Sequence, residues 1–392
     1  MPSFFMQSVI NFFIDIGKLK NKKRRGWLLH QIEKSESTAS HIFRMAILTW
    51  MLGRKKRFNL QRALKMALIH DICEIFTRDE TPYDPLLPKR IDSPQSQKTA
   101  NKILEKWPKF SLSQKKRKII LKQKRERLAL EKLISKLPCN LKEEIRNLWI
   151  DFEKGLSREA RFTKQIDKAE NLLQGLEYWE KYGRIQRDLW IRWAREIFDI
   201  PVLIEFEQAI EKKFVQKKTK RKGEIDEILN FLIKIGKLKE TMRKGAVLIK
   251  AKNPETIAEH SFRVAIMSWV LAEEKRTKLN FEKILKMALI HDICEVYTGD
   301  ITLYDKILPK DEKEWPELFD KWPRFSRREK KKIVQKKQKQ EKKALRKLIA
   351  NLPKDLKEEV KDLRAEYQEL SSKEARFVKQ VNRIETLLQA LE

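Results

Sequence analysis

Residues 66–74 read Met-Ala-Leu-Ile-His-Asp-Ile-Cys-Glu, and residues 287–295 repeat all nine without a change. On a continuous helix, Glu74 would lie four residues after His70 and three after Asp71, so an imidazole and two carboxylates would share one face. The apolar run before them indicates a buried helix. Because buried carboxylates without partners are costly, a bound divalent metal is the simplest interpretation. A His-Asp pair satisfied by hydrogen bonds is the alternative, and the duplication favours the metal.

The duplication extends over the whole chain. Copy one covers residues 1–214, copy two covers residues 223–392, and a polar basic run, residues 215–222, links them. Only ten glycines occur among the 392 residues, and Lys, Glu, Leu and Ile dominate, as is typical of helical proteins. No segment alternates apolar and polar residues for long enough to predict a sheet. The sequence therefore predicts an all-α protein with two helical bundles in tandem.

Each copy is expected to contain three long helices around its histidines. The first is predicted to begin at His41, and the second near Asn59, since asparagine is a favourable N-cap. The third is Lys-rich, and its charged face is expected to be solvated. The predicted ranges, copy one before copy two, are 42–52 and 261–271, then from 59 and 280 through the duplicated stretch, then 113–136 and 328–348.

The composition narrows the choice of partners. The net charge of +32 fits a nucleic-acid surface, attraction of anionic substrates, or a compositional bias of the source organism. Nucleic-acid binding is not favoured, because the sequence has no zinc knuckle, RGG run or glycine-rich RNA-binding signature. No apolar run approaches the roughly 20 residues that span a bilayer, so no membrane partner is expected. The three cysteines make no disulfide framework, which favours a reducing cytoplasm.

The five histidines supply candidate metal ligands. Four occupy equivalent positions in the two copies, whereas His30 has no counterpart and is expected at the surface or in a loop. The ordered set in copy one is His41, then His70 with Asp71, then the distant Asp167. This mixed nitrogen and oxygen set suits a divalent cation such as Mn, Co, Fe, Ni, Zn or Mg rather than a dedicated calcium cage.

The order His, His-Asp, Asp on helices resembles the signature of HD-domain phosphohydrolases. The flanking motifs are similar to those of one branch, the 5′-deoxynucleotidases: Arg-x-Gly-Trp at 24–27, His-Asp-x-x-Glu at 70–74, Gly-Asp at 299–300 and Glu-Ala-Arg-Phe-x-Lys-Gln-x-Asp at 159–167. The resemblance covers most of both copies apart from the basic inserts. It implies two HD-domain bundles and release of phosphate from (deoxy)nucleoside 5′-monophosphates by attack of a metal-bound water. Single-domain enzymes of this branch are typically dimeric, so it also implies that the two copies pack as an intramolecular pseudo-dimer.

The resemblance further implies roles for individual residues. Glu74 would handle protons on the water or the leaving oxygen, and Asp79 would support it or help to hold a second ion. Arg24 would clamp the phosphate, because a guanidinium offers paired donors. Trp27 would shape the nucleoside pocket, although a core position is the alternative. The implied metal ligands are His41, His70, Asp71, Asp167, His260, His291 and Asp292, and the counterparts of Glu74, Asp79 and Arg24 in copy two are Glu295, Asp300 and Arg243.

The two copies depart from the family pattern in different ways. Copy two has Asn382 at the position of Asp167, so its last ligand has lost its charge. It ends at the residue that aligns with Glu177, and so has no counterpart of the tail in residues 178–214. Copy one has Ser40 where copy two has a glutamate. Because Asn382 leaves copy two with Asp292 as its only charged ligand, we expect copy one to carry most of the activity.

Two other functions stay open at this point. One is an HD hydrolase of another phosphate compound, such as a dNTP, a cyclic dinucleotide or a guanosine polyphosphate. The other is a non-enzymatic basic scaffold that binds nucleotides or RNA. A pure binding module has no need of four intact ligands in copy one, so metal content discriminates between enzyme and scaffold.

Overall fold

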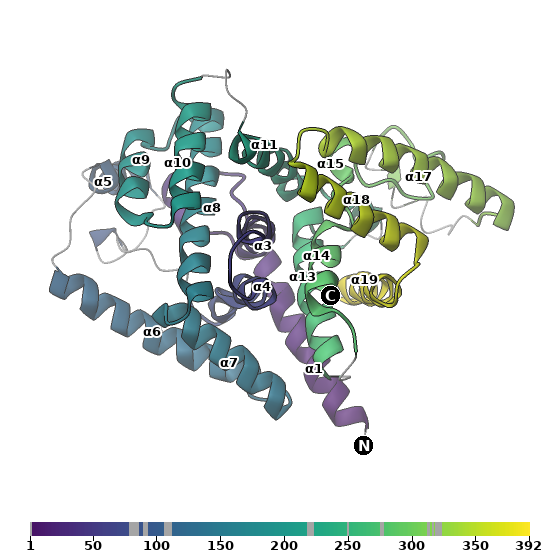
Figure 1. Ribbon diagram of the computed structural model, residues 1–392, viewed down its shortest axis with the longest axis horizontal. Coiled ribbons are helices and arrows are strands. Elements are labelled where there is room, and N and C mark those ends of the chain that lie inside the picture. Colours follow the sequence, from purple (N-terminus) through teal and green to yellow (C-terminus); the bar gives the residue numbers. More distant parts are fainter. Residues whose placement is uncertain are drawn as a thin grey trace. The chain divides into compact units, whose positions relative to one another are not determined.

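The chain is organised as two helical units (Figure 1). The computed structural model describes residues 2–77, 86–88, 93–105, 112–217, 223–248, 251–274, 278–311, 314–315, 317 and 324–392. Unit 1 comprises Met1–Arg221 and unit 2 comprises Lys222–Glu392. Within the described ranges, the only extended pairings are two isolated β-bridges, Lys23 with Ser37 and Met242 with Thr256. The predicted all-α class is confirmed.

Unit 1 is built around a fully buried helix. All sixteen residues of α3 (Thr38–Gly53) are buried, and this helix packs against α4 and α8. The helices of unit 1 are α1 (Pro2–Gly17), η1 (Lys18–Lys20), α2 (Arg25–Leu29), α3, α4 (Leu60–Ile69), η2 (Ile72–Ile75), α5 (Pro94–Glu105), α6 (Leu112–Ile134), α7 (Cys139–Lys154), α8 (Arg158–Tyr182), α9 (Arg187–Ile197) and α10 (Pro201–Phe214).

Helix α3 begins earlier than the sequence predicted. Its N-cap is Ser37, whose side chain accepts a hydrogen bond from the backbone N–H of Ser40. A serine in this role satisfies one of the unpaired N–H groups at a helix start. His41 therefore lies inside the first turn instead of marking the beginning of the helix, and its side chain is fixed within the core.

The duplicated stretch is not one continuous helix, which corrects the prediction. The expected N-cap is confirmed, since the Asn59 side chain accepts from the N–H of Arg62. Helix α4 then ends at Ile69, and a separate 3-10 turn, η2, covers Ile72–Ile75. Asp71 lies between them with φ of −110° and ψ of 13°. The break turns Glu74 away from the helical position that its spacing suggested.

The described helices of unit 2 follow the order of those in unit 1 up to α19, which is the counterpart of α8. Its buried helix α13 packs against α14 and α19, and α14 also packs against α18. The predicted Lys-rich helices are confirmed as α6 and α17. The helices of unit 2 are α11 (Glu224–Gly236), η4 (Lys237–Lys239), α12 (Lys244–Leu248), α13 (Ile257–Glu274), α14 (Phe281–Ile290), α15 (Glu295–Thr298), α17 (Arg327–Leu348), α18 (Lys354–Glu369) and α19 (Lys373–Leu391). Among the described residues of both units, every helix is too short or too polar to cross a membrane.

Candidate metal centre

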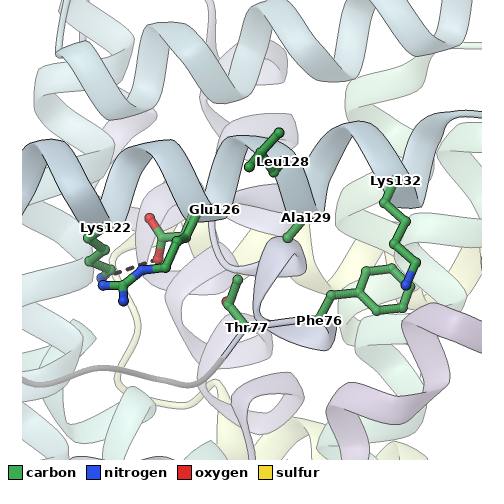
Figure 2. Close-up of a pocket in the computed structure, with 8 residues that line it drawn as sticks. Phe76, Thr77, Lys122, Glu126, Leu128, Ala129 and Lys132 are labelled. Atoms are coloured by element: carbon green, nitrogen blue, oxygen red, sulfur yellow. Dashed lines mark ion pairs between the residues drawn. The ribbon is translucent and has the colours of Figure 1, made fainter.

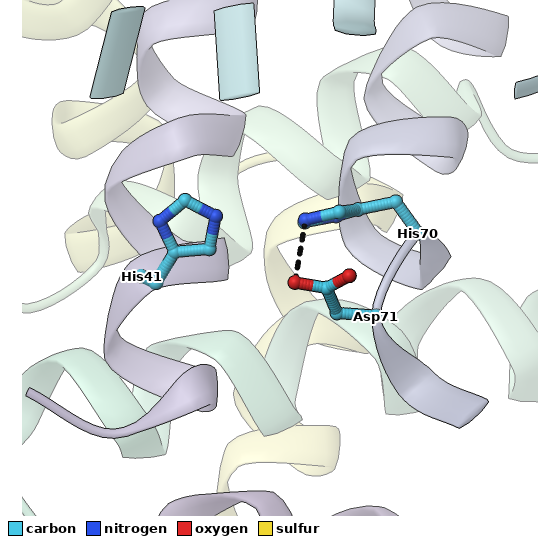
Figure 3. Close-up of side chains that lie close together, drawn as sticks. All are labelled: His41, His70 and Asp71. Carbon is cyan, nitrogen blue, oxygen red and sulfur yellow. Dashed lines mark ion pairs between the residues drawn. The ribbon is translucent and has the colours of Figure 1, made fainter. Parts of the chain in front are cut away.

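Three side chains of unit 1 converge where α3 meets the end of α4 (Figure 3). His41, His70 and Asp71 each offer a ligand atom, and these atoms lie within 4.8 Å of one another. The Nε2 atom of His70 lies 3.0 Å from Oδ2 of Asp71. Helix α8 adds the fourth predicted residue, because Asp167 Oδ1 lies 3.2 Å from His41 Nε2. The structure thus brings together all four residues of the sequence-derived set.

In both His41 and His70, the Nδ1 atom is hydrogen-bonded away from the cluster, and the Nε2 atom points into it. His70 Nδ1 lies 2.9 Å from the carbonyl oxygen of Ala67, so it must carry the proton and donate. His41 Nδ1 is held by the carboxylate of Glu170. The Nε2 atoms of both rings are buried, and neither makes a hydrogen bond of ordinary geometry among the described residues, although each lies close to an aspartate oxygen. Two oriented nitrogens beside two carboxylates fit a divalent cation.

The two aspartates carry negative charge although Asp167 is buried and Asp71 is half-buried. Burial raises the pKa of the Asp71 carboxyl, but the neighbouring His70 outweighs this and holds the pKa below its ordinary value. Burial likewise opposes ionisation of Asp167, yet Lys168 and His41 keep its pKa well below the ordinary value. Both carboxylates are therefore ionised at neutral pH, as ligands for a cation must be.

A buried network that the sequence analysis missed supports His41. Glu170 contacts His41 through one carboxylate oxygen and accepts from Arg44 Nε at 2.8 Å through the other. Arg44 also donates to Gln174 at 2.9 Å and to Glu177 at 2.7 Å. Carboxylates that fix the second nitrogen of a ligating histidine orient the ring and raise its basicity. The repetition of His-x-x-Arg at 41–44 and 260–263 was the sequence signal for this network.

The predicted proton-transfer residue Glu74 is buried near the cluster on η2. Its Oε2 atom accepts from the hydroxyl of Thr38 at 3.1 Å. Lys22 donates to the backbone carbonyls of Glu74 and Thr77, and so ties η2 to the loop before α2. Asp79 lies outside the described residues, and its role stays a prediction.

The predicted phosphate and nucleoside residues lie on the start of α2. Arg24, its N-cap, donates to Asn171 at 2.5 Å and lies 3.4 Å from Glu36. Trp27 is 3% exposed, and its indole N–H donates to Glu36 at 3.0 Å. The Trp27 ring packs on Tyr178 and the tail residue Trp190. Trp27 is therefore part of an aromatic core cluster.

Unit 2 repeats the cluster of two histidines and one aspartate. The ligand atoms of His260, His291 and Asp292 lie within 4.8 Å of one another. The Nε2 atoms of the two rings face each other at 3.2 Å, and Asp292 Oδ2 lies 3.1 Å from His291 Nε2. His260 Nδ1 is held by Glu385, which also pairs with Arg263 at 2.9 Å. The supporting network of unit 1 thus recurs.

The fourth residue of the candidate ligand set differs between the units. Asn382 stands where unit 1 has Asp167, and its amide Nδ2 donates to the hydroxyl of Tyr367 at 2.8 Å. Phe152 occupies the position of Tyr367 in unit 1. The structure therefore places the last residue of the set beside His41 in unit 1, whereas its counterpart in unit 2 is paired with a tyrosine.

The remaining predicted residues of unit 2 surround the same cluster. Arg243 lies 2.6 Å from His260 Nδ1 and 3.0 Å from Glu255. Burial, together with Asp292 and Asp300, raises the pKa of Glu295 well above its ordinary value. Lys337 of the Lys-rich helix lies 3.9 Å from Glu295 and donates to the carbonyl of Ile301 at 2.8 Å. The charged face of this helix is thus only partly solvated.

A basic cavity in unit 1 lies between η2 and helix α6 (Figure 2). Its volume is about 460 Å³. Lys132 lies over the ring of Phe76 with 4.4 Å to the centroid, and Lys122 pairs with Glu126 at 3.4 Å. Burial raises the pKa of Glu126 to about 7. Glu126, followed by Asp71 and Glu74, raises the pKa of Lys122 against the opposing effect of burial.

Comparison with known proteins agrees with this arrangement. A family model described as HD domain matches residues 16–120, 110–195 and 235–392. The chain is 32% identical over 183 residues to 5′-deoxynucleotidase HDDC2 of Xenopus laevis, covering 46% of this chain and 75% of that protein. It is 31% identical over 204 residues to 5′-deoxynucleotidase hdd1 of Schizosaccharomyces pombe, covering 50% and 85% respectively. A solved structure of a conserved hypothetical protein from Pyrococcus furiosus is 21% identical, with a TM-score of 0.37, over 52% of this chain and 99% of that one. The family match extends over most of both units and includes the histidines and aspartates of both clusters, so the chain belongs to the HD domain family.

Proposed function

We propose that unit 1 is a metal-dependent phosphohydrolase that releases phosphate from (deoxy)nucleoside 5′-monophosphates. The observation that carries this proposal is the convergence of two buried imidazole nitrogens with two ionised carboxylates in one cluster. The similarity to proteins named 5′-deoxynucleotidase supports a nucleotide substrate.

The four side chains have a common task in this proposal. His41, His70, Asp71 and Asp167 would hold a divalent cation of the first transition series or magnesium. Such an ion lowers the pKa of a bound water toward neutrality and neutralises phosphoryl oxygens. Glu170 and the carbonyl of Ala67 keep the two rings oriented through their Nδ1 atoms.

Glu74 is the proposed proton-transfer residue. Its carboxylate is buried, and the hydroxyl of Thr38 donates to Oε2. This hydrogen bond fixes the direction of the carboxylate, which can then accept a proton from the attacking water or return one to the leaving oxygen. The contacts of Lys22 hold the turn that carries Glu74 in place.

Arg24 is the proposed phosphate ligand. Asn171 accepts from Arg24 and donates to Asp167 Oδ1 at 3.0 Å, so one amide joins the guanidinium to a metal ligand. The Arg24 side chain is 14% exposed, and solvent therefore reaches it. A guanidinium at that place can bind phosphate oxygens with two parallel donors. Lys122 adds positive potential from the neighbouring cavity.

The test is phosphate release over a panel of substrates. The full-length protein is assayed with nucleoside and deoxynucleoside 5′-monophosphates, dNTPs, a cyclic dinucleotide and a guanosine polyphosphate, each with added Mn²⁺, Co²⁺ or Mg²⁺. We expect turnover of monophosphates that is lost in the Asp71→Ala variant. Turnover confined to another phosphate compound would replace the substrate class, and turnover unchanged by Asp71→Ala would contradict the site.

A further inference from the structure

Two positions on neighbouring helices differ jointly between the units. They lie on α7 and α8 in unit 1 and on α18 and α19 in unit 2. In unit 1 they are Phe152 and Asp167, and in unit 2 they are Tyr367 and Asn382. Asp167 turns its carboxylate toward His41, with 3.2 Å between Oδ1 and Nε2. Asn382 instead donates its amide to the Tyr367 hydroxyl at 2.8 Å. A phenylalanine offers no oxygen for such a bond.

The two aromatic rings otherwise occupy equivalent places. The centroid of Phe152 lies 5.3 Å from the ring of His70, and the centroid of Tyr367 lies 5.5 Å from the ring of His291. Tyr367 is 5% exposed, so its hydroxyl cannot be satisfied by bulk water and requires a partner nearby. Asn382 supplies that partner. The chemical difference at this position is therefore the single hydroxyl group.

We propose that Tyr367 is a positioning residue that holds Asn382 away from the metal cluster of unit 2 and thereby weakens metal binding there. The inference rests on the proposed function, because it takes the four-residue set of unit 1 as the working metal centre. The bond to Tyr367 uses the amide nitrogen of Asn382, and its Oδ1 atom, the possible ligand, accepts from the Thr386 hydroxyl at 3.5 Å. With the side chain held in this orientation, unit 2 keeps His260, His291 and Asp292, of which only Asp292 carries charge. A cation bound there loses one ligand and one unit of neutralising charge.

A third difference on the same helix acts in the same direction. Arg364 of α18 stands where unit 1 has Trp149, and it is 5% exposed. Its guanidinium donates to the backbone carbonyl of His291, the residue directly before Asp292. The same guanidinium lies 3.4 Å from Glu341. A positive charge bound to the residue before Asp292 opposes the approach of a metal cation.

The test measures metal affinity in unit 2 of the full chain. His70→Ala and Asp71→Ala remove the site of unit 1, and Co²⁺ is titrated while heat and visible absorption are followed. Asn382→Asp, Tyr367→Phe and the double variant are compared in this background. We expect Asn382→Asp alone to alter affinity little, because the Tyr367 hydroxyl can donate to the new carboxylate. Tyr367→Phe alone should tighten binding only slightly, because the side chain that it releases is neutral. Multiplying the fold-changes in Co²⁺ affinity of the two single variants gives the affinity expected without coupling. The double variant should bind Co²⁺ about tenfold more tightly than that.

The reciprocal pair in unit 1 is the matched control. In a His291→Ala/Asp292→Ala background, Phe152→Tyr with Asp167→Asn should lower Co²⁺ affinity more than Asp167→Asn alone. Thermal unfolding shows whether each variant folds. If the variants of unit 2 do not fold, the comparison of Phe152→Tyr/Asp167→Asn with Asp167→Asn in unit 1 tests the inference.

Several outcomes overturn the inference. If Asn382→Asp alone binds Co²⁺ as tightly as the double variant, the Tyr367 hydroxyl does not restrain residue 382, and the role of Tyr367 is refuted. A double variant without tighter binding refutes it as well. If unit 1 of the unchanged protein binds no Co²⁺, the proposed function fails instead, and the two failures are thus distinguishable.

Discussion

His41 Nε2 lies 3.2 Å from Asp167 Oδ1, although α3 and α8 are far apart in the sequence. The same helix α8 brings Glu170 to the other nitrogen of this ring. One imidazole is therefore fixed on both sides by carboxylates that are three residues apart on one helix face. This arrangement makes α8 the element that completes the candidate metal centre.

The first prediction concerns the negative charge of Asp167 beside His41. Asp167→Asn keeps the shape of the side chain but removes a negative charge beside the cation, and we expect metal affinity to fall about tenfold or more. Calorimetric titration with Mn²⁺ measures it. Asp188→Asn, at a side chain that is 75% exposed, is the matched control and should leave affinity unchanged. Equal affinities for the two variants would show that Asp167 is no ligand.

The second prediction concerns Glu170 as a positioning residue. Glu170→Gln keeps an acceptor for Arg44 but weakens the interaction with His41 Nδ1, so we expect metal affinity to fall about 10- to 100-fold. A Glu170→Gln variant that loses thermal stability but retains full metal affinity would assign Glu170 a purely structural role.

The third prediction separates chemistry from metal retention. Glu74→Gln should lower turnover about a hundredfold or more, the usual scale for an acid–base group, while metal content stays at the level of the unchanged protein. Thr38→Val removes the hydroxyl that orients Glu74 and should lower turnover by a smaller factor. Metal content and initial rates are measured on the same preparations. Near-normal turnover of Glu74→Gln would refute the role.

The fourth prediction concerns which unit works. Asp71→Ala should abolish most turnover of a nucleoside monophosphate, whereas Asp292→Ala should leave most of it, because unit 2 has Asn382 in place of a charged ligand. Both variants are assayed with saturating metal on the same nucleotide. The assignment is wrong if Asp292→Ala abolishes turnover and Asp71→Ala leaves it intact.

The candidate ligands could be recognised in the sequence because they occur twice. His41, His70 and Asp71 recur in both copies, and a recurring polar set inside apolar helices indicates function. Spacing alone could not show that α4 ends at Ile69 or that Asp71 departs from helical geometry, because the repeated letters fit a continuous helix equally well. The prediction that the two copies pack as a pseudo-dimer stays a prediction.

Other features were hidden because they depend on contacts between distant helices. Glu170 looks like an ordinary charged residue of an exposed helix until α8 packs against α3, and Arg44 would be expected at a surface rather than fully buried. The pairing of Tyr367 with Asn382 was equally invisible. Comparing the two copies position by position would have shown that Phe152 and Asp167 change together, and this was the sequence signal for that pair.

The most direct test is the metal content of the full-length protein after purification and loading with Mn²⁺ or Co²⁺. We compare His70→Ala, which removes a ligand, with His30→Ala, which removes a histidine that has no counterpart in unit 2. The account predicts that the unchanged protein and His30→Ala hold at least one tightly bound divalent ion per chain, and that His70→Ala loses the tightest one together with phosphate release. Equal metal content and equal phosphate release in His70→Ala and His30→Ala would contradict it.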